Sequence, residues 1–138
     1  MHSERERNRM RGCLRLTTVF LLASLVGGCG AGGSDSAEVA PQELLLLEER
    51  GALLLDVRSP EEYASGHVPG AVNVPYDELE VRLPDLGAAT GDPVVVYCEK
   101  GPRASKALGV LRAAGYGSAR TLAGHMARWR VSGLPVER

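Results

Sequence analysis

Short apolar runs alternate with polar segments along the chain from about residue 41 onward. Four of these runs are too short for helices and read as buried strands, at 52–57, 71–74, 93–97 and 119–122. The segments between them carry helix start and stop signals, such as Pro at the first helical position and Gly after the last. We predict helices at 41–50, 59–66, 77–83, 103–114 and 126–131. Strands that alternate with helices predict a single α/β domain, with a small parallel sheet covered by helices on both faces.

The N-terminal pattern differs from the rest and is typical of an export signal. Arginines precede an apolar run, Leu16–Val26, whose eleven residues are too few to cross a bilayer as a helix. The run ends in Val26-Gly27-Gly28-Cys29, which resembles a bacterial lipobox, in which the Cys receives lipid. An uncleaved anchor and an ordinary secretory signal are the alternatives, and Met10 is an alternative start.

These features predict three parts of the chain: a signal peptide over 1–28, a lipid-anchored flexible tether over 29–37 and a folded domain over 38–138. The protein is expected to be exported and held on the cell membrane or the outer membrane, on its periplasmic or extracellular face. Membrane contact is expected through the lipid on Cys29 alone.

Composition narrows the choice of partners and of chemistry. The net charge is −1 and aromatic residues make up 4% of the chain, so neither electrostatics nor base stacking favours a nucleic-acid partner. Cys13 would leave with the signal and Cys29 would be acylated, which makes Cys98 the only free thiol. A lone thiol is a candidate reactive residue, with a buried structural cysteine as the alternative. A single Cys does not hold a metal unaided, and we expect neither a metal nor another cofactor.

Cys98 follows the clearest predicted strand and precedes a predicted helix. Ligands of parallel α/β sheets bind at the carboxyl ends of strands, and a helix N-terminus favours negative charge, here a thiolate. Gly101 permits a loop that wraps backbone N–H groups around an anion, and Lys100 and Arg103 add positive charge. The arrangement suits a nucleophile that attacks an anionic, electrophilic sulfur.

Three motifs in order resemble the rhodanese family, and together they cover roughly residues 39–136. They are Asp56-Val57-Arg58 with Glu61-Glu62-Tyr63 and Gly66 to Pro75, then Tyr97 to Arg103, then Leu122-Ala123-Gly124 with Trp129 and Gly133 to Val136. The resemblance implies a rhodanese-like domain and a sulfurtransferase. Its Cys98 would take sulfane sulfur from thiosulfate or from a persulfide or polysulfide, carry it as a persulfide and pass it to a thiol acceptor.

The resemblance also assigns roles around the nucleophile. The substrate-binding loop would comprise Glu99, Lys100, Gly101, Pro102 and Arg103, with Asp56 and Arg58 as supporting residues that mainly pair with neighbours. The alternative is a non-catalytic rhodanese-like module on the cell envelope, which binds a partner or carries sulfur.

Loop length and three departures from the family pattern refine the prediction. Four residues separate Cys98 from Arg103, whereas related cell-cycle phosphatases and many arsenate reductases have five, and the shorter loop suits a bound sulfur atom. Glu99 stands where related loops often have Arg, Pro102 lacks an N–H, and His125 stands where the family often has Gly. Because a carboxylate beside the thiolate disfavours its charge and repels a dianion, we expect thiosulfate to be a poorer donor than a persulfide or polysulfide. We expect His67 to be a turn residue and Trp129 to lie in the core, and leave open whether His125 lies near the site.

Overall fold

The computed structural model describes residues 37–138, which form a parallel sheet with helices on both faces. The strands of this part of the chain are β1 (Glu38–Val39), β2 (Leu53–Asp56), β3 (Val72–Asn73), β4 (Val94–Tyr97) and β5 (Arg120–Leu122). They lie in the order β1-β5-β4-β2-β3 and every pair is parallel. The helices are α1 (Pro41–Glu48), α2 (Pro60–Ala64), α3 (Leu79–Arg82), α4 (Pro102–Ala113) and α5 (His125–Val131), with a 3₁₀ turn η1 (Leu83–Asp85) after α3.

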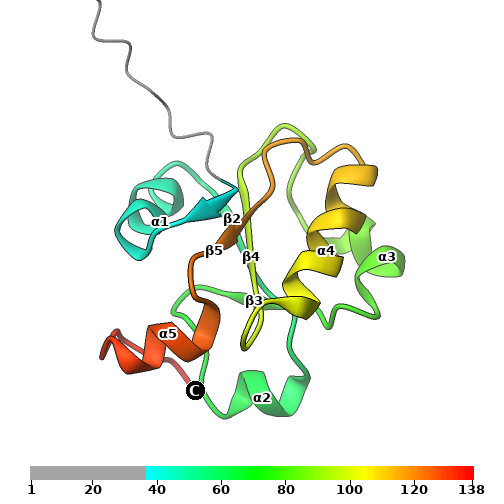
Figure 1. The fold of residues 1–138 in the computed structure, drawn as a ribbon. Helices are drawn as coiled ribbons and strands as arrows, with labels where there is room; N and C mark the ends of the chain where they lie inside the picture. The colour runs from blue at the N-terminus through cyan, green and yellow to red at the C-terminus, as the bar shows by residue number, and fades with distance from the viewer. Residues whose placement is uncertain (1–36) are drawn as a thin grey trace, which may run out of the picture. The chain divides into compact units, whose positions relative to one another are not determined.

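The central strand β4 divides the core into two halves. Val94 and Val96 pack in one hydrophobic cluster with residues of α3 and α4, whereas Val95 and Tyr97 pack in the other with residues of α1 and α5. All four side chains are buried, as the alternation of a strand covered on both faces requires. Figure 1 shows α1 and α5 on one side of the sheet and α3 and α4 on the other. The predicted α/β class with helices on both faces is therefore confirmed.

Element types follow the sequence prediction, and the boundaries differ by a few residues. The first helix ends at Glu48 instead of residue 50, because the chain turns there and Gly51 takes a positive φ of 81°. Helix α4 begins at Pro102, and the helix predicted over 77–83 is shortened to α3 and followed by η1. The sequence prediction missed β1, since a two-residue strand has no periodicity of its own and is defined by its pairing with β5.

The start of α2 is fixed by reciprocal hydrogen bonds. The Ser59 side chain accepts from the Glu62 N–H at 3.3 Å, and the Glu62 carboxylate accepts from the Ser59 N–H at 3.0 Å. This capping box confirms the predicted helix start. It also orients Glu62, whose carboxylate reaches the helix that follows Cys98.

The predictions for the N-terminal part of the chain stay predictions. The signal peptide, the lipidated Cys29 and nearly all of the tether lie outside the described residues. Within residues 37–138, no helix is both long enough and apolar enough to cross a membrane.

Candidate active site

Cys98 lies directly after β4, at the carboxyl edge of the sheet, and is 1% exposed. The backbone N–H of Gly101 donates a hydrogen bond to Cys98 Sγ over 3.0 Å. The turn that allows this requires a φ of 125° at Gly101, a conformation that residues with a Cβ rarely adopt. The loop therefore presents a backbone donor to the sulfur, as the sequence suggested.

Helix α4 begins immediately after this turn, with Gly101 as N-cap and Pro102 at the first helical position. An N–H at that position has no partner within a helix, so Pro102 removes no helical hydrogen bond. The N-terminus of a twelve-residue helix lies next to the sulfur, and such a terminus attracts negative charge. A thiolate held in this way is a soft nucleophile suited to attack on sulfur.

The first turn of α5 holds the other side of the same loop. The N–H groups of Met126 and Ala127 donate to the carbonyls of Cys98 and Glu99, each over 3.0 Å. The backbone N–H of Cys98 points to His125 Nδ1 at 3.5 Å. Sequence reasoning named the motif that precedes α5 but missed this support, because the partners are 27 positions apart and no local pattern joins them.

Asp56 and Arg58, the predicted supporting residues, form a wholly buried ion pair at the carboxyl end of β2. The Arg58 side chain donates from Nη2 to Asp56 Oδ2 over 2.6 Å and from Nε to both carboxylate oxygens over 3.0 Å, and both side chains are 0% exposed. Arg58 Nη2 also donates to the Gly66 carbonyl at 2.8 Å. The Asn73 amide donates to the carbonyls of Asp56 and Arg58, over 2.9 and 3.0 Å. Arg58 thus joins β2 to the segment after α2. Asn73 is a further residue of this hydrogen-bond network, and the sequence analysis did not assign it a role.

Glu99 occupies a different electrostatic setting from the one that its position in the sequence suggests. Its Oε1 accepts from Arg130 Nη1 at 2.6 Å, and its Oε2 lies 3.3 Å from Arg58 Nη1. Two guanidinium groups therefore compensate the carboxylate that was expected to oppose the thiolate. The expectation was incomplete because Arg130 is 31 positions away along the chain.

Arg103 is engaged by α2. Its two terminal nitrogens donate to the two carboxylate oxygens of Glu62 over 2.6 and 2.9 Å. This bidentate pairing lowers the pKa of Glu62 to about 2 and raises the pKa of Arg103. The pair fastens the first turn of α4 to α2, so Arg103 supports the loop from outside, while Lys100 lies exposed within it.

The remaining residues weighed in the sequence occupy the places expected of them. His67 Nδ1 lies 3.0 Å from the Tyr63 carbonyl, and its ring stacks on that of Tyr63 with centroids 3.7 Å apart. Trp129 is 5% exposed and donates from Nε1 to the Pro135 carbonyl over 2.7 Å. His125, whose place was left open, contacts the Cys98 loop.

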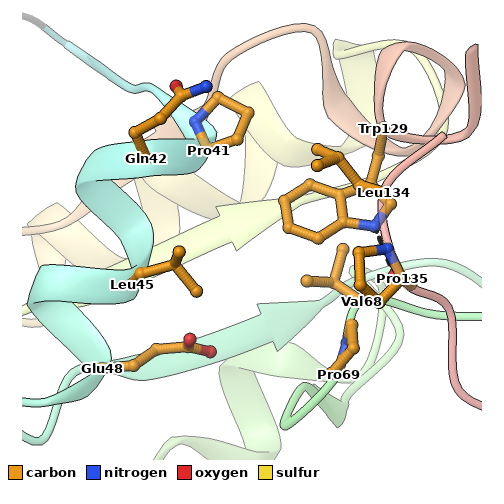
Figure 2. A pocket seen from close by; sticks show the side chains of 9 residues that line it. All are labelled: Pro41, Gln42, Leu45, Glu48, Val68, Pro69, Trp129, Leu134 and Pro135. Carbon is orange, nitrogen blue, oxygen red and sulfur yellow. Dashed lines mark hydrogen bonds between the residues drawn. The ribbon is translucent and has the colours of Figure 1, made fainter. Parts of the chain in front are cut away.

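A hollow of about 370 Å³ lies on the α1 and α5 side of the domain, apart from the Cys98 loop. Figure 2 shows the Trp129 ring and Leu134 facing Leu45 and Pro41 of α1 across it. Glu48 supplies the one carboxylate of its lining, and burial raises the pKa of that group. The hollow holds neither a nucleophile nor any residue of the 98–103 loop, so the chemistry belongs to the loop.

Comparisons with protein families, with other sequences and with solved structures indicate the same family. The family model described as "Rhodanese-like domain" matches residues 40–132. A human thiosulfate:glutathione sulfurtransferase is 37% identical over an alignment 101 residues long, which covers 64% of this chain and 88% of that protein. The solved structure of the human single domain sulfurtransferase TSTD1 is 36% identical, with a TM-score of 0.62 over 70% of this chain and 96% of that one. An HTH-type transcriptional regulator from Mycobacterium tuberculosis is 41% identical over an alignment 109 residues long, which covers 76% of this chain but only 46% of the regulator.

Proposed function

The chain belongs to the rhodanese-like domain family, and from this membership we propose that it is a sulfurtransferase in which Cys98 carries the sulfur. One observation carries the proposal: the Gly101 N–H lies 3.0 Å from Cys98 Sγ at the start of α4. The same donor and the same helix terminus are suited to hold the terminal sulfur of a persulfide, which also bears negative charge.

The first half of the cycle loads the enzyme. The Cys98 thiolate attacks the outer sulfur of thiosulfate, a sulfur–sulfur bond forms to Cys98, and the bond to the sulfonate sulfur breaks. Sulfite leaves with the bonding electron pair and its two negative charges, and the Cys98 persulfide anion remains. With a persulfide donor the leaving group is the donor's thiolate.

The second half returns the enzyme to its starting state. An acceptor thiolate attacks the terminal sulfur of the Cys98 persulfide, and the bond between the two sulfurs breaks. The acceptor leaves as a persulfide anion and Cys98 is again a thiolate, so no external oxidant or reductant is needed. The protein named thiosulfate:glutathione sulfurtransferase is a relative whose name includes a thiol of this class.

The charges around the loop affect which sulfur donor the site would favour. Carboxylates already engage the guanidinium groups of Arg58, Arg103 and Arg130. Beside these ion pairs, the exposed Lys100 is the cation that the loop itself offers, so the attraction for a dianion such as thiosulfate is modest. We therefore propose that a persulfide or polysulfide is a better donor than thiosulfate, and that a small thiol is the acceptor.

Mass spectrometry of the protein after incubation with a polysulfide tests the proposal. We expect the tryptic peptide Leu83–Lys100, in which Cys98 is the only cysteine, to gain one sulfur atom. Dithiothreitol should remove that atom. Recovery of this peptide without added sulfur, from protein that is folded and reduced, would contradict the assignment and favour a binding module.

We also propose that the protein is a lipoprotein, cleaved before Cys29 and acylated there. The support is the sequence Val26-Gly27-Gly28-Cys29 after an apolar run and before a Gly/Ser-rich segment. Buried acyl chains contribute about 0.8 kcal/mol for each CH₂, and more than one chain gives stable anchoring. The wild type is expected in the membrane fraction, with an intact mass that corresponds to residues 29–138 plus lipid.

Cys29→Ala is the matched control for this localisation. It should lack the lipid mass and should no longer be found as processed protein in the membrane fraction. A Cys13→Ala variant should behave as the wild type, because residue 13 lies within the predicted signal peptide. Full-length wild-type protein in the soluble cytoplasmic fraction would refute the lipoprotein assignment without affecting the sulfur chemistry.

A further inference from the structure

The imidazole of His125 lies close to both ends of the turn that holds the nucleophile. Its Nδ1 lies 3.5 Å from the backbone nitrogen of Cys98, which donates to it. Its Nε2 would lie 3.2 Å from a Cβ built on Gly101. Cys98 and Gly101 are the two residues joined by the bond from the Gly101 N–H to Sγ. One ring on α5 therefore spans the turn that places the donor on the sulfur.

The backbone at His125 is also unusual. Its φ of 54° is positive, and it is the one non-glycine residue of the described chain with that property. The residue is 8% exposed. A residue with a Cβ persists in this left-handed region when its surroundings compensate for the strain, and such positions cluster at functional sites. The imidazole thus takes a place where glycine would fit the backbone more easily.

We propose that neutral His125 is a positioning residue for the nucleophile loop: it accepts the Cys98 N–H through Nδ1 and braces Gly101, which keeps the Gly101 N–H on Sγ. For its effect on sulfur transfer the inference rests on the proposed function. The effect on the reactivity of the Cys98 thiol does not depend on what the thiol transfers.

The contact between His125 and the Cys98 N–H should depend on pH. Burial lowers the pKa of His125, against a smaller opposing effect of the Glu38 charge on β1. From the loop, the backbone N–H of Cys98 reaches the ring, and Arg128 lies one turn further along the same helix. Once protonated, Nδ1 becomes a donor and faces the Cys98 N–H, which is also a donor. The supporting contact is therefore present above the pKa of His125 and lost as the pH falls through it.

Two variants separate the ring contact from the backbone. His125→Asn and His125→Gly both tolerate a positive φ, but only Asn offers a side-chain acceptor close to the Cys98 N–H, and Asn does not titrate. The measurement is the rate of Cys98 alkylation by iodoacetamide between about pH 5 and pH 8, together with kcat/KM for transfer from a polysulfide to glutathione. Circular dichroism melting shows that each variant is folded.

We expect the alkylation rate and kcat/KM of His125→Gly to fall about tenfold at neutral pH. A loss of this size corresponds to the removal of one hydrogen bond. At the acid end, the wild-type rates should fall more steeply than those of His125→Asn, in which no imidazole titrates. Wild-type rates in His125→Gly, or an unchanged acid limb in His125→Asn, would overturn the inference. If alkylation follows the predicted pattern while the wild type transfers no sulfur, the proposed function fails and the positioning role stands.

Discussion

Sulfur transfer is expected to disappear when Cys98 is replaced by serine, with a loss in turnover of at least about a thousandfold, a scale typical of removing a covalent nucleophile. A serine hydroxyl is not ionised near neutral pH and is a weak nucleophile without an adjacent base. The loop offers Sγ a backbone N–H donor at 3.0 Å, which stabilises an anion but does not remove a proton from a hydroxyl. The assay is persulfide transfer from a polysulfide to glutathione.

The chain offers a matched control for this loss. Cys29→Ser makes the same chemical change at the predicted lipidation site, and we expect it to retain full turnover once the protein is purified in detergent-free buffer. Cys98→Ser should also melt close to the wild type, because serine has almost the same size as the buried cysteine. Turnover that survives in Cys98→Ser would assign the sulfur chemistry to another group.

The hydrophobic pattern was sufficient to predict the layers of this domain. The short apolar runs at 93–97 and 52–57 carry too little amphipathic character for surface elements, so burial on both faces was the natural interpretation. The position of Cys98 at the end of such a run then placed it at the carboxyl edge of the sheet. The order of the strands could not be predicted from the same pattern. Strand β1 illustrates the reason, because its two residues form a strand only by pairing with β5, more than 80 positions later in the chain.

The candidate site was predictable where its contacts are local. Gly101 lies three positions after Cys98, and the glycine's conformational freedom was enough to suggest the turn that its φ of 125° produces. Long-range contacts were beyond the sequence. The charge of Glu99 could be recognised, but not its compensation by Arg130 of α5, and the position of His125 against the loop could only be left open.

The buried pair of Asp56 and Arg58 gives the largest stability prediction. Asp56→Ala leaves the guanidinium of Arg58 without its main partner in a place where both side chains are 0% exposed. Removing one member of such a pair costs about 3–5 kcal/mol, because the remaining charge is desolvated and uncompensated. We expect the free energy of unfolding to fall by about that amount, as measured by urea denaturation with circular dichroism. The Glu99 carboxylate, 3.3 Å from Arg58, offsets only part of the loss.

Two comparisons separate the effect of burial from that of the charge itself. The exposed pair of Arg82 and Glu78 is 3.6 Å apart and 44% and 55% exposed, so Glu78→Gln should change the unfolding free energy by no more than about 0.5 kcal/mol. The double variant Asp56→Leu with Arg58→Met removes both buried charges, and we expect it to be more stable than Asp56→Ala alone, because no unpaired charge remains. A double variant that is as unstable as Asp56→Ala would instead assign the stabilisation to the bonds that Arg58 makes to the Gly66 carbonyl and to Glu99.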